Sequence, residues 1–230
     1  MSNASITLYH YPLCPFSRMV RLLTAEAGVK VRLVEERAWN RRPEFLQLNP
    51  AGEVPVMVLE DGTALSGSGP ISEFLAETGA ASALMPDTPV ERAEMRRIVA
   101  WFERKFDREV TRNLVTEKID RRFMPKELGG GAPDAAAVRA GLANIRAHLK
   151  YVGYLAHRRN WLSGERLSLA DLAAAAQLSC IDYLGHVPWG ESAPAHAWYA
   201  RIKSRPSFRP LLADQVAGMP PPPAYADLDF

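Results

Sequence analysis

The first 80 residues contain short apolar stretches of both strand and helix type. Residues 6–11 combine β-branched and aromatic side chains and end at Pro12, which is typical of a strand. Residues 15–28 begin with a proline, end with a glycine and space their apolar side chains for one helical face, which predicts a helix. A second strand is expected at residues 29–35, so the chain opens with a β-α-β unit.

The same region continues with a second group of short elements. These are a short helix at 43–48, strands at 54–59 and 64–65, and a helix at 70–78. The two strands flank residues 60–62 (EDG), which carry the strongest hairpin signal in the chain. Ser68 is able to cap the helix that follows. The order β-α-β-α-β-β-α predicts a thioredoxin-like α/β domain.

Beyond residue 86 the pattern is helical only. A long amphipathic helix is expected at 89–116, and Asp134 should cap a second helix that runs to about residue 158. Residues 168–171 (SLAD) form a capping box before the alanine-rich stretch 172–183. The predicted organisation is a thioredoxin-like domain at 1–80, a linker at 81–88, an all-α domain at 89–216 and a proline-rich tail at 217–230.

Composition narrows the possible classes of protein. The chain is 47% hydrophobic and 23% charged, as expected for a soluble globular protein, and it has no segment of membrane-spanning length. Two cysteines are too few for a disulfide framework, so a cytoplasmic location is expected. A net charge of +2 argues against a general nucleic-acid binder, and the five histidines lack metal-ligand spacing. Residues 92–126 are locally basic, with eleven Lys/Arg against six Asp/Glu. This run is either a solvated helix face or a surface for an anionic partner.

Four separated motifs carry a resemblance to a known family. They are residues 11–17 (YPLCPFS), 49–57 (NPAGEVPVM), 168–171 (SLAD) and 198–208 (WYARIKSRPSF). In this order and spacing the chain resembles the glutathione-transferase superfamily, which implies a thioredoxin-like N-terminal domain and an all-α C-terminal domain. The resemblance also implies a cis bond before Pro55, with the backbone of Val54 facing the cysteinyl part of any bound glutathione.

The resemblance raises the question of whether thiol chemistry survives. Cys14 starts a helix, where the dipole favours a thiolate, and it is similar to the cysteine of omega-like and glutaredoxin-like members; alternatively it is a small hydrophobic residue. Ser68 matches the serine that holds a glutathione carboxylate, but Gly67 replaces the usual Glu or Gln, and losing that contact costs about 1.5–3 kcal/mol. We therefore expect no catalytic residue and no cofactor. If the protein is an enzyme, Cys14 is the catalytic residue, and Val54, Pro55 and Ser68 hold glutathione.

Two further segments are candidates for partner binding. Trp39 lies in a basic segment at the rim of the family's cleft, where it is either a lid or an exposed anchor, and we favour the anchor. The tail PPPPAYADLDF is typical of a linear recognition motif, although many C-terminal ends are simply frayed. On this interpretation, deletion from Tyr225 should leave the melting temperature near wild type. The partner-binding residues predicted here are Trp39, Tyr225, Asp227, Leu228, Asp229 and Phe230.

The altered pocket and the tail together resemble a branch of the family that binds the bacterial division protein FtsZ. That resemblance implies a non-enzymatic, homodimeric adaptor on FtsZ filaments, concentrated at the division site and coupling constriction to cell-wall synthesis, without nucleic-acid binding or membrane insertion. The alternative function is a glutathione-dependent transferase or thiol reductase that uses Cys14.

Overall fold

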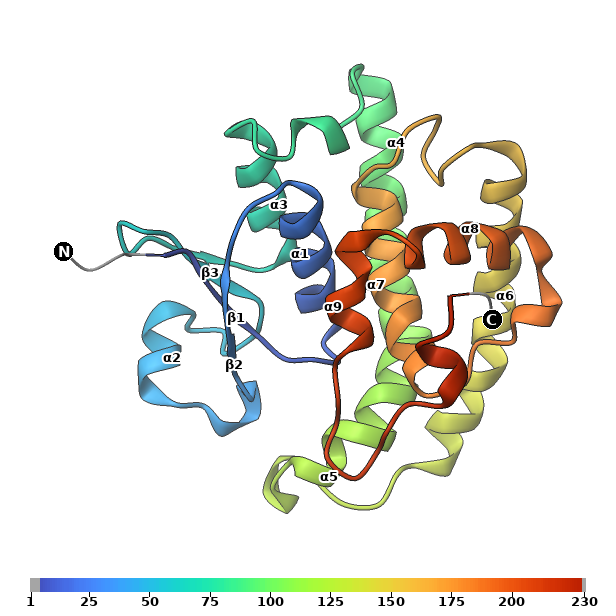
Figure 1. The fold of residues 1–230 in the computed structure, drawn as a ribbon. Helices are drawn as coiled ribbons and strands as arrows, with labels where there is room; N and C mark the ends of the chain where they lie inside the picture. The colour runs from blue at the N-terminus through green and yellow to red at the C-terminus, as the bar shows by residue number, and fades with distance from the viewer. Residues whose placement is uncertain (1–4, 229–230) are drawn as a thin grey trace.

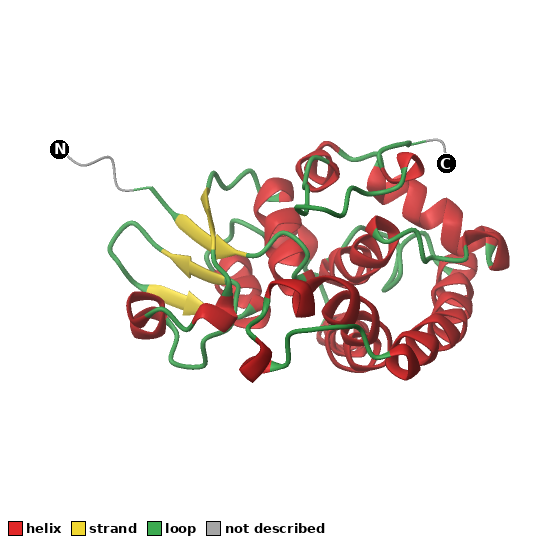
Figure 2. Ribbon diagram, turned by 90° about the horizontal axis from the view of Figure 1, so that it is seen from below, coloured by secondary structure: helices red, strands yellow, loops and turns green. Residues whose placement is uncertain are grey.

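The computed structural model describes residues 5–228, which form a sheet-containing part and a helical part packed side by side (Figures 1 and 2). The first part contains β1 (Thr7–His10), α1 (Pro15–Glu26), β2 (Arg32–Glu35), η1 (Ala38–Asn40), α2 (Pro43–Leu48), β3 (Val56–Val58), β4 (Ala64–Ser66) and α3 (Ser68–Glu77). A short 3-10 turn, η2 (Ser82–Leu84), follows in the linker. The thioredoxin-like arrangement predicted from the sequence is confirmed.

The sheet has the strand order β2-β1-β3-β4. β1 and β2 run parallel, and α1 supplies the crossover that a parallel pair requires. The other two pairings are antiparallel. In the turn between β3 and β4, the Asp61 carboxylate accepts the Thr63 N–H at 2.9 Å, and Gly62 has φ +89°. This conformation favours glycine, which explains why the EDG sequence predicts the hairpin.

The second part consists of helices and short turns. Its elements are α4 (Pro89–Ala100), η3 (Trp101–Asp120), α5 (Arg121–Phe123), η4 (Lys126–Leu128), α6 (Ala135–Arg158), α7 (Leu169–Tyr183), η5 (Trp189–Glu191), α8 (Ala193–Lys203), η6 (Pro206–Phe208), α9 (Arg209–Leu212) and η7 (Pro223–Tyr225). η3 is wound as a π-helix and joins α4 to α5, so the long helix extends seven residues beyond the predicted end, to residue 123. Among the described residues, no helix is both long enough and apolar enough to cross a membrane.

Helices α6 and α7 begin directly after the capping residues predicted from the sequence. The Asp134 carboxylate accepts the backbone N–H of Ala136 at 2.7 Å, and Ser168 and Asp171 form a reciprocal capping box. α7 is buried along its whole length, and its alanines allow neighbouring helices to approach closely. α1 packs against α7, so one apolar core continues through both parts of the molecule.

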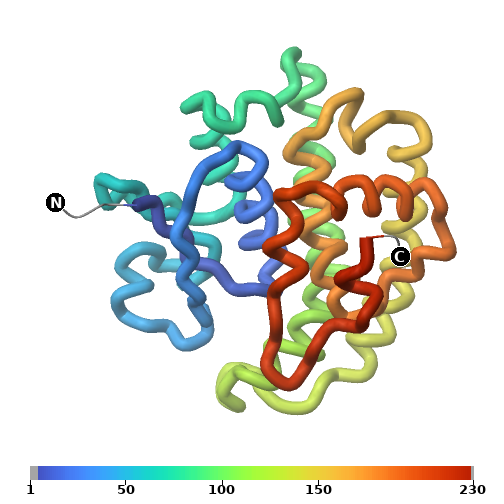
Figure 3. Tube along the Cα trace, viewed as in Figure 1, coloured from blue at the N-terminus to red at the C-terminus, as the bar shows by residue number. Residues whose placement is uncertain are grey.

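The proline-rich tail folds back onto the helical part (Figure 3). The Tyr183 hydroxyl donates to the Met219 carbonyl at 2.8 Å, and η7 then places the ring of Tyr225 against that of Tyr183, with 5.2 Å between centroids. On the sequence alone, this segment is interpreted as a linear recognition motif or a frayed end. In the structure it docks as far as Tyr225.

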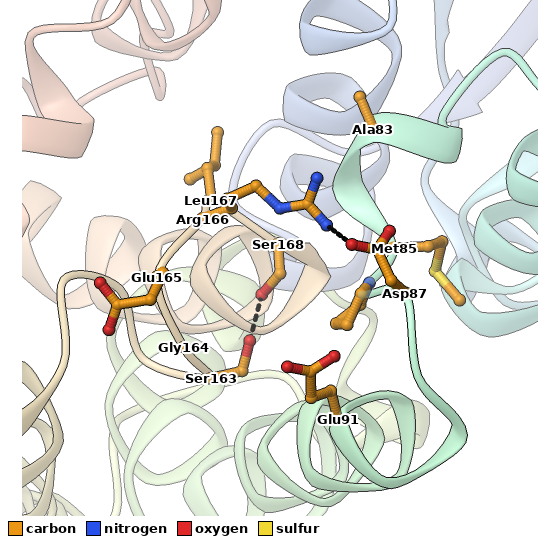
Figure 4. A pocket seen from close by; sticks show the side chains of 11 residues that line it. Ala83, Met85, Asp87, Glu91, Ser163, Gly164, Glu165, Arg166, Leu167 and Ser168 are labelled. Atoms are coloured by element: carbon orange, nitrogen blue, oxygen red, sulfur yellow. Dashed lines mark hydrogen bonds and ion pairs between the residues drawn. The ribbon is translucent and has the colours of Figure 1, made fainter.

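A cavity of about 360 Å³ lies where the linker meets the loop between α6 and α7 (Figure 4). Arg166 forms an ion pair with Asp87 across it at 2.7 Å, and the hydroxyls of Ser163 and Ser168 are 2.7 Å apart. Glu91 is engaged in the cap of α4. Because these polar groups contact one another or cap helices, we interpret this region as a structural junction.

Candidate functional site

The candidate site is a cleft between the loops of the thioredoxin-like domain and η3. It comprises two adjoining hollows of about 180 and 620 Å³. The smaller is lined by Tyr11, Cys14, Trp39, Val115 and Asp120 among others, and the larger by Val54, Pro55, Gly67, Ser68 and Glu103 among others. Within residues 5–228, His, Cys, Asp and Glu side chains nowhere gather in threes as potential metal ligands.

Cys14 occupies the N-terminal cap of α1. Its sulfur accepts the Ser17 backbone N–H at 3.4 Å, and its thiol donates to the Val54 carbonyl at 3.7 Å. Burial nevertheless raises the pKa of the Cys14 thiol to about 11, because the loss of solvation outweighs the hydrogen bonds that favour the thiolate. Of the two alternatives left open by the sequence, a thiolate or a small hydrophobic residue, this pKa favours the second, because at neutral pH the thiol stays protonated.

The loop before β3 has the form that the family resemblance implies. The Val54–Pro55 bond is cis, as predicted. The Asn49 amide donates to the Glu53 carbonyl at 2.8 Å and so ties the loop to the end of α2. Val54 and Pro55 both line the larger hollow, which places the predicted glutathione-facing backbone at the cleft.

Ser68 has a protein partner that the sequence did not reveal. Its hydroxyl donates to Glu103 Oε1 at 2.5 Å, from the start of α3 across the cleft to η3. Desolvation in the cleft raises the pKa of Glu103, which is half-buried and lines the larger hollow. A carboxyl group of the chain itself thus lies where the resemblance implies that a glutathione carboxylate binds.

The residue before Ser68 cannot supply a recognition group. Gly67 has φ +92°, a conformation that side chains rarely adopt, and a Cβ placed there would meet only a ring atom of Pro70, at 3.6 Å. Glutamate or glutamine would therefore be strained at this position. The backbone at this position thus has a conformation that glycine adopts without strain.

Trp39 stands at the rim of the smaller hollow. It lies in η1, is half-buried, and packs edge-on against Tyr11 with 5.1 Å between ring centroids. This contact fixes one edge of the indole and leaves part of the ring at the surface. Trp39 therefore borders the cleft and is partly accessible, and its role as an anchor for a partner stays a prediction.

Asp120 is a site residue that the sequence reasoning missed. Thr116 donates to its Oδ2 at 3.1 Å, while its buried Oδ1 has no hydrogen-bond partner within the described chain. Desolvation raises the pKa of Asp120 to about 6. Arg112, Thr116 and Asp120 all line the smaller hollow, and their spacing of four residues on one helix is the signal that would have pointed to them.

The tail residues predicted to bind a partner fall into three groups. Tyr225 is fully buried, and its hydroxyl accepts from Arg18 Nη1 at 3.0 Å and donates to the Leu211 carbonyl at 3.0 Å. The prediction of a partner contact at Tyr225 is corrected, because this side chain is part of the core. Asp227 and Leu228 are exposed. Asp229 and Phe230 lie outside the described residues.

Comparison with known proteins establishes the protein family to which the chain belongs. The family model for the glutathione S-transferase N-terminal domain matches residues 13–78, and that for the C-terminal domain matches residues 117–206. The chain therefore belongs to the glutathione S-transferase family, as its motifs predicted.

Particular relatives match over nearly the whole chain. FtsZ-localized protein A of Caulobacter vibrioides is 45% identical over 97% of this chain and 98% of its own length. The solved structure of FzlA from C. crescentus, also 45% identical, has a TM-score of 0.92 and covers 98% of this chain and 100% of that one. A glutathione S-transferase structure from Sinorhizobium meliloti 1021 has a TM-score of 0.94 at 48% identity, with the same coverage.

Proposed function

We propose that this chain is a non-enzymatic adaptor that binds FtsZ filaments in the cytoplasm of a dividing bacterium. The observation that carries the proposal is the hydrogen bond from Ser68 to Glu103, which occupies the serine that the family resemblance assigns to a glutathione carboxylate. The relative named for its localisation with FtsZ, similar over nearly the full length, supports the choice of partner.

The energetics of the cleft disfavour glutathione. An incoming carboxylate must displace the Glu103 carboxyl group from Ser68, and it meets a like charge if that group is ionised. Leaving a buried polar group without its partner costs about 1–3 kcal/mol. Gly67 adds to this cost because it cannot supply the acidic or amide contact. With Cys14 protonated at neutral pH, thiol transfer also lacks its nucleophile.

The rim of the cleft offers a face for protein binding. Trp39 provides a large and partly fixed aromatic surface, as binding hot spots often do. The basic segment 92–126, most of which lies in α4, η3 and α5, borders the same cleft through Arg112. A homodimer presents this face twice, so that it bridges filament subunits and gains affinity from two linked contacts.

Co-sedimentation with polymerised FtsZ tests this proposal. Wild-type protein should pellet with the polymer, and binding should weaken as salt is raised, because charge steers the association. Trp39→Ala should weaken binding by about 30-fold, as truncation of a hot spot does. Val90→Ala is the matched control, because Val90 is 79% exposed at the start of α4, away from the cleft.

Three results would contradict the adaptor. The first is equal pelleting of the Trp39→Ala and Val90→Ala variants, and the second is no pelleting of wild type at any salt concentration. The third is glutathione conjugation or deglutathionylation by wild type that is lost in Cys14→Ala, which would favour the transferase instead.

A further inference from the structure

The larger hollow of the cleft has a carboxyl group on each of its two walls. Glu53 comes from the loop before β3, and Glu103 comes from η3. Among the described residues that line this hollow, Arg112 is the one cation. Its Nε donates to Asp107 Oδ2 at 2.6 Å, so its charge is already compensated by a carboxylate that does not line the hollow. The larger hollow therefore has an excess of negative charge.

The two carboxyl groups of the hollow have no cationic partner. Within residues 5–228, no Lys, Arg or His nitrogen lies at ion-pairing distance from Glu53 or Glu103. Arg104 lowers the pKa of Glu103 from a greater distance, but desolvation outweighs this effect. In the adjoining hollow, the buried Oδ1 of Asp120 also has no hydrogen-bond partner in the described chain. Burial of carboxyl groups is costly unless they are paired, so the cleft favours a cationic ligand.

The other walls of the larger hollow suit the aliphatic part of an arginine side chain. Phe16, Pro55 and Pro70 line it with apolar surface, and its volume of about 620 Å³ exceeds that of one side chain. The methylene groups of arginine pack on such surfaces while the charged end stays with polar groups. Its planar guanidinium has five N–H donors, so it can donate to a carboxyl group on each wall. A hydrophobic side chain would leave both carboxyl groups unpaired.

We propose that the larger hollow binds an arginine side chain from an extended segment of a partner protein, with the guanidinium between Glu53 and Glu103. The inference rests on the proposed adaptor function, because it takes the ligand to be part of a protein. It also assigns the hollow a charge preference opposite to that of a glutathione site, since the two carboxylates of glutathione would meet like charges there.

Fluorescence anisotropy with full-length protein tests this inference. The probe is a labelled peptide of alternating arginine and alanine, compared with the same peptide carrying citrulline, an uncharged isostere, in place of arginine. Wild type should bind the arginine peptide about tenfold more tightly. Glu103→Gln keeps an oxygen acceptor for Ser68 but loses the charge, so it should weaken binding by about tenfold. Glu53→Gln should weaken binding by about threefold, because Glu53 is exposed.

Glu77→Gln is the matched control. It removes the same charge from an exposed residue at the opposite end of α3 from Ser68, and it should bind the peptide as wild type does. The inference is overturned if Glu103→Gln and Glu77→Gln bind alike, or if the citrulline peptide binds as tightly as the arginine peptide. It is also overturned if spermidine binds more tightly than the peptide, which would make a free polyamine the ligand. Unchanged circular dichroism of each variant shows that a loss of binding does not reflect unfolding.

Co-sedimentation with polymerised FtsZ separates this inference from the adaptor function. Wild type should pellet with the polymer, and Glu103→Gln should pellet less than Glu77→Gln. If wild type pellets and the two variants pellet alike, the adaptor stands and the arginine contact with this partner is refuted. If wild type does not pellet, the adaptor is refuted, and the peptide titration still decides whether the hollow binds arginine.

Discussion

The buried anchor of the tail, Tyr225, gives a prediction that runs against the sequence-based expectation for this segment. Its hydroxyl lies between Arg18 and the Leu211 carbonyl, with both contacts at 3.0 Å. Arg18 is fully buried and also donates to Ser179 and to Asp214. The tail is thus joined through one phenol to a charged network that begins in α1.

The expected loss of stability on mutation of Tyr225 follows from these contacts. Tyr225→Phe keeps the ring but removes a hydrogen bond to a buried guanidinium, which is worth about 1.5–3 kcal/mol. For a chain of this size each kcal/mol shifts the melting temperature by about 2–4 °C, so a loss of about 3–12 °C is expected. Deletion from Tyr225 also empties the ring's site in the core and should cost more, about 3–5 kcal/mol.

Urea and thermal denaturation followed by circular dichroism measure both changes. Leu228→Ser is the control, because this exposed tail residue should alter the free energy of unfolding by less than about 0.5 kcal/mol. A Tyr225→Phe variant as stable as the control would refute the claim that the tail is anchored through Arg18.

Two further predictions concern groups in the cleft. Because the pKa of Cys14 is about 11, alkylation of Cys14 by iodoacetamide should be slow at neutral pH and should accelerate about tenfold per pH unit. Mass spectrometry measures the extent of alkylation. Rapid labelling that does not change with pH would contradict this prediction. Burial raises the pKa of Asp120 from 3.8 to about 6, so the native state binds more protons than the unfolded state between these values and loses stability as pH rises through them. Asp120→Asn removes this loss, so the variant should be more stable than wild type by about 1–3 kcal/mol at neutral pH. The difference in the free energy of unfolding should shrink toward about pH 4. Urea titrations that give an equal difference at about pH 7 and about pH 4 would contradict this prediction.

Much of the fold was predictable because its signals are local. The EDG turn, the Asp134 cap and the SLAD capping box each depend on residues within four positions of one another, and each has its predicted role. The end of the long helix was misplaced because η3 continues through packing against α6 and α7, which no local signal encodes.

The site was less predictable because its decisive contacts are distant in sequence. Ser68 and Glu103 are 35 residues apart, and Arg18 and Tyr225 are 207 residues apart. The sequence left the protonation state of Cys14 open, since a helix start is visible in a sequence whereas the desolvation that opposes a thiolate is not. Tyr225 was misassigned for a related reason, because an aromatic residue after four prolines looks the same whether it projects or packs.

Calorimetric titration of glutathione into wild type, Glu103→Ala and Glu53→Ala tests most directly whether the pocket is closed from within. Glu53 lines the same hollow and is exposed, so its removal changes the charge without freeing Ser68. We predict no saturable heat for wild type or Glu53→Ala at up to roughly 10 mM glutathione, and measurable binding for Glu103→Ala. Submillimolar binding by the wild-type protein would contradict the account.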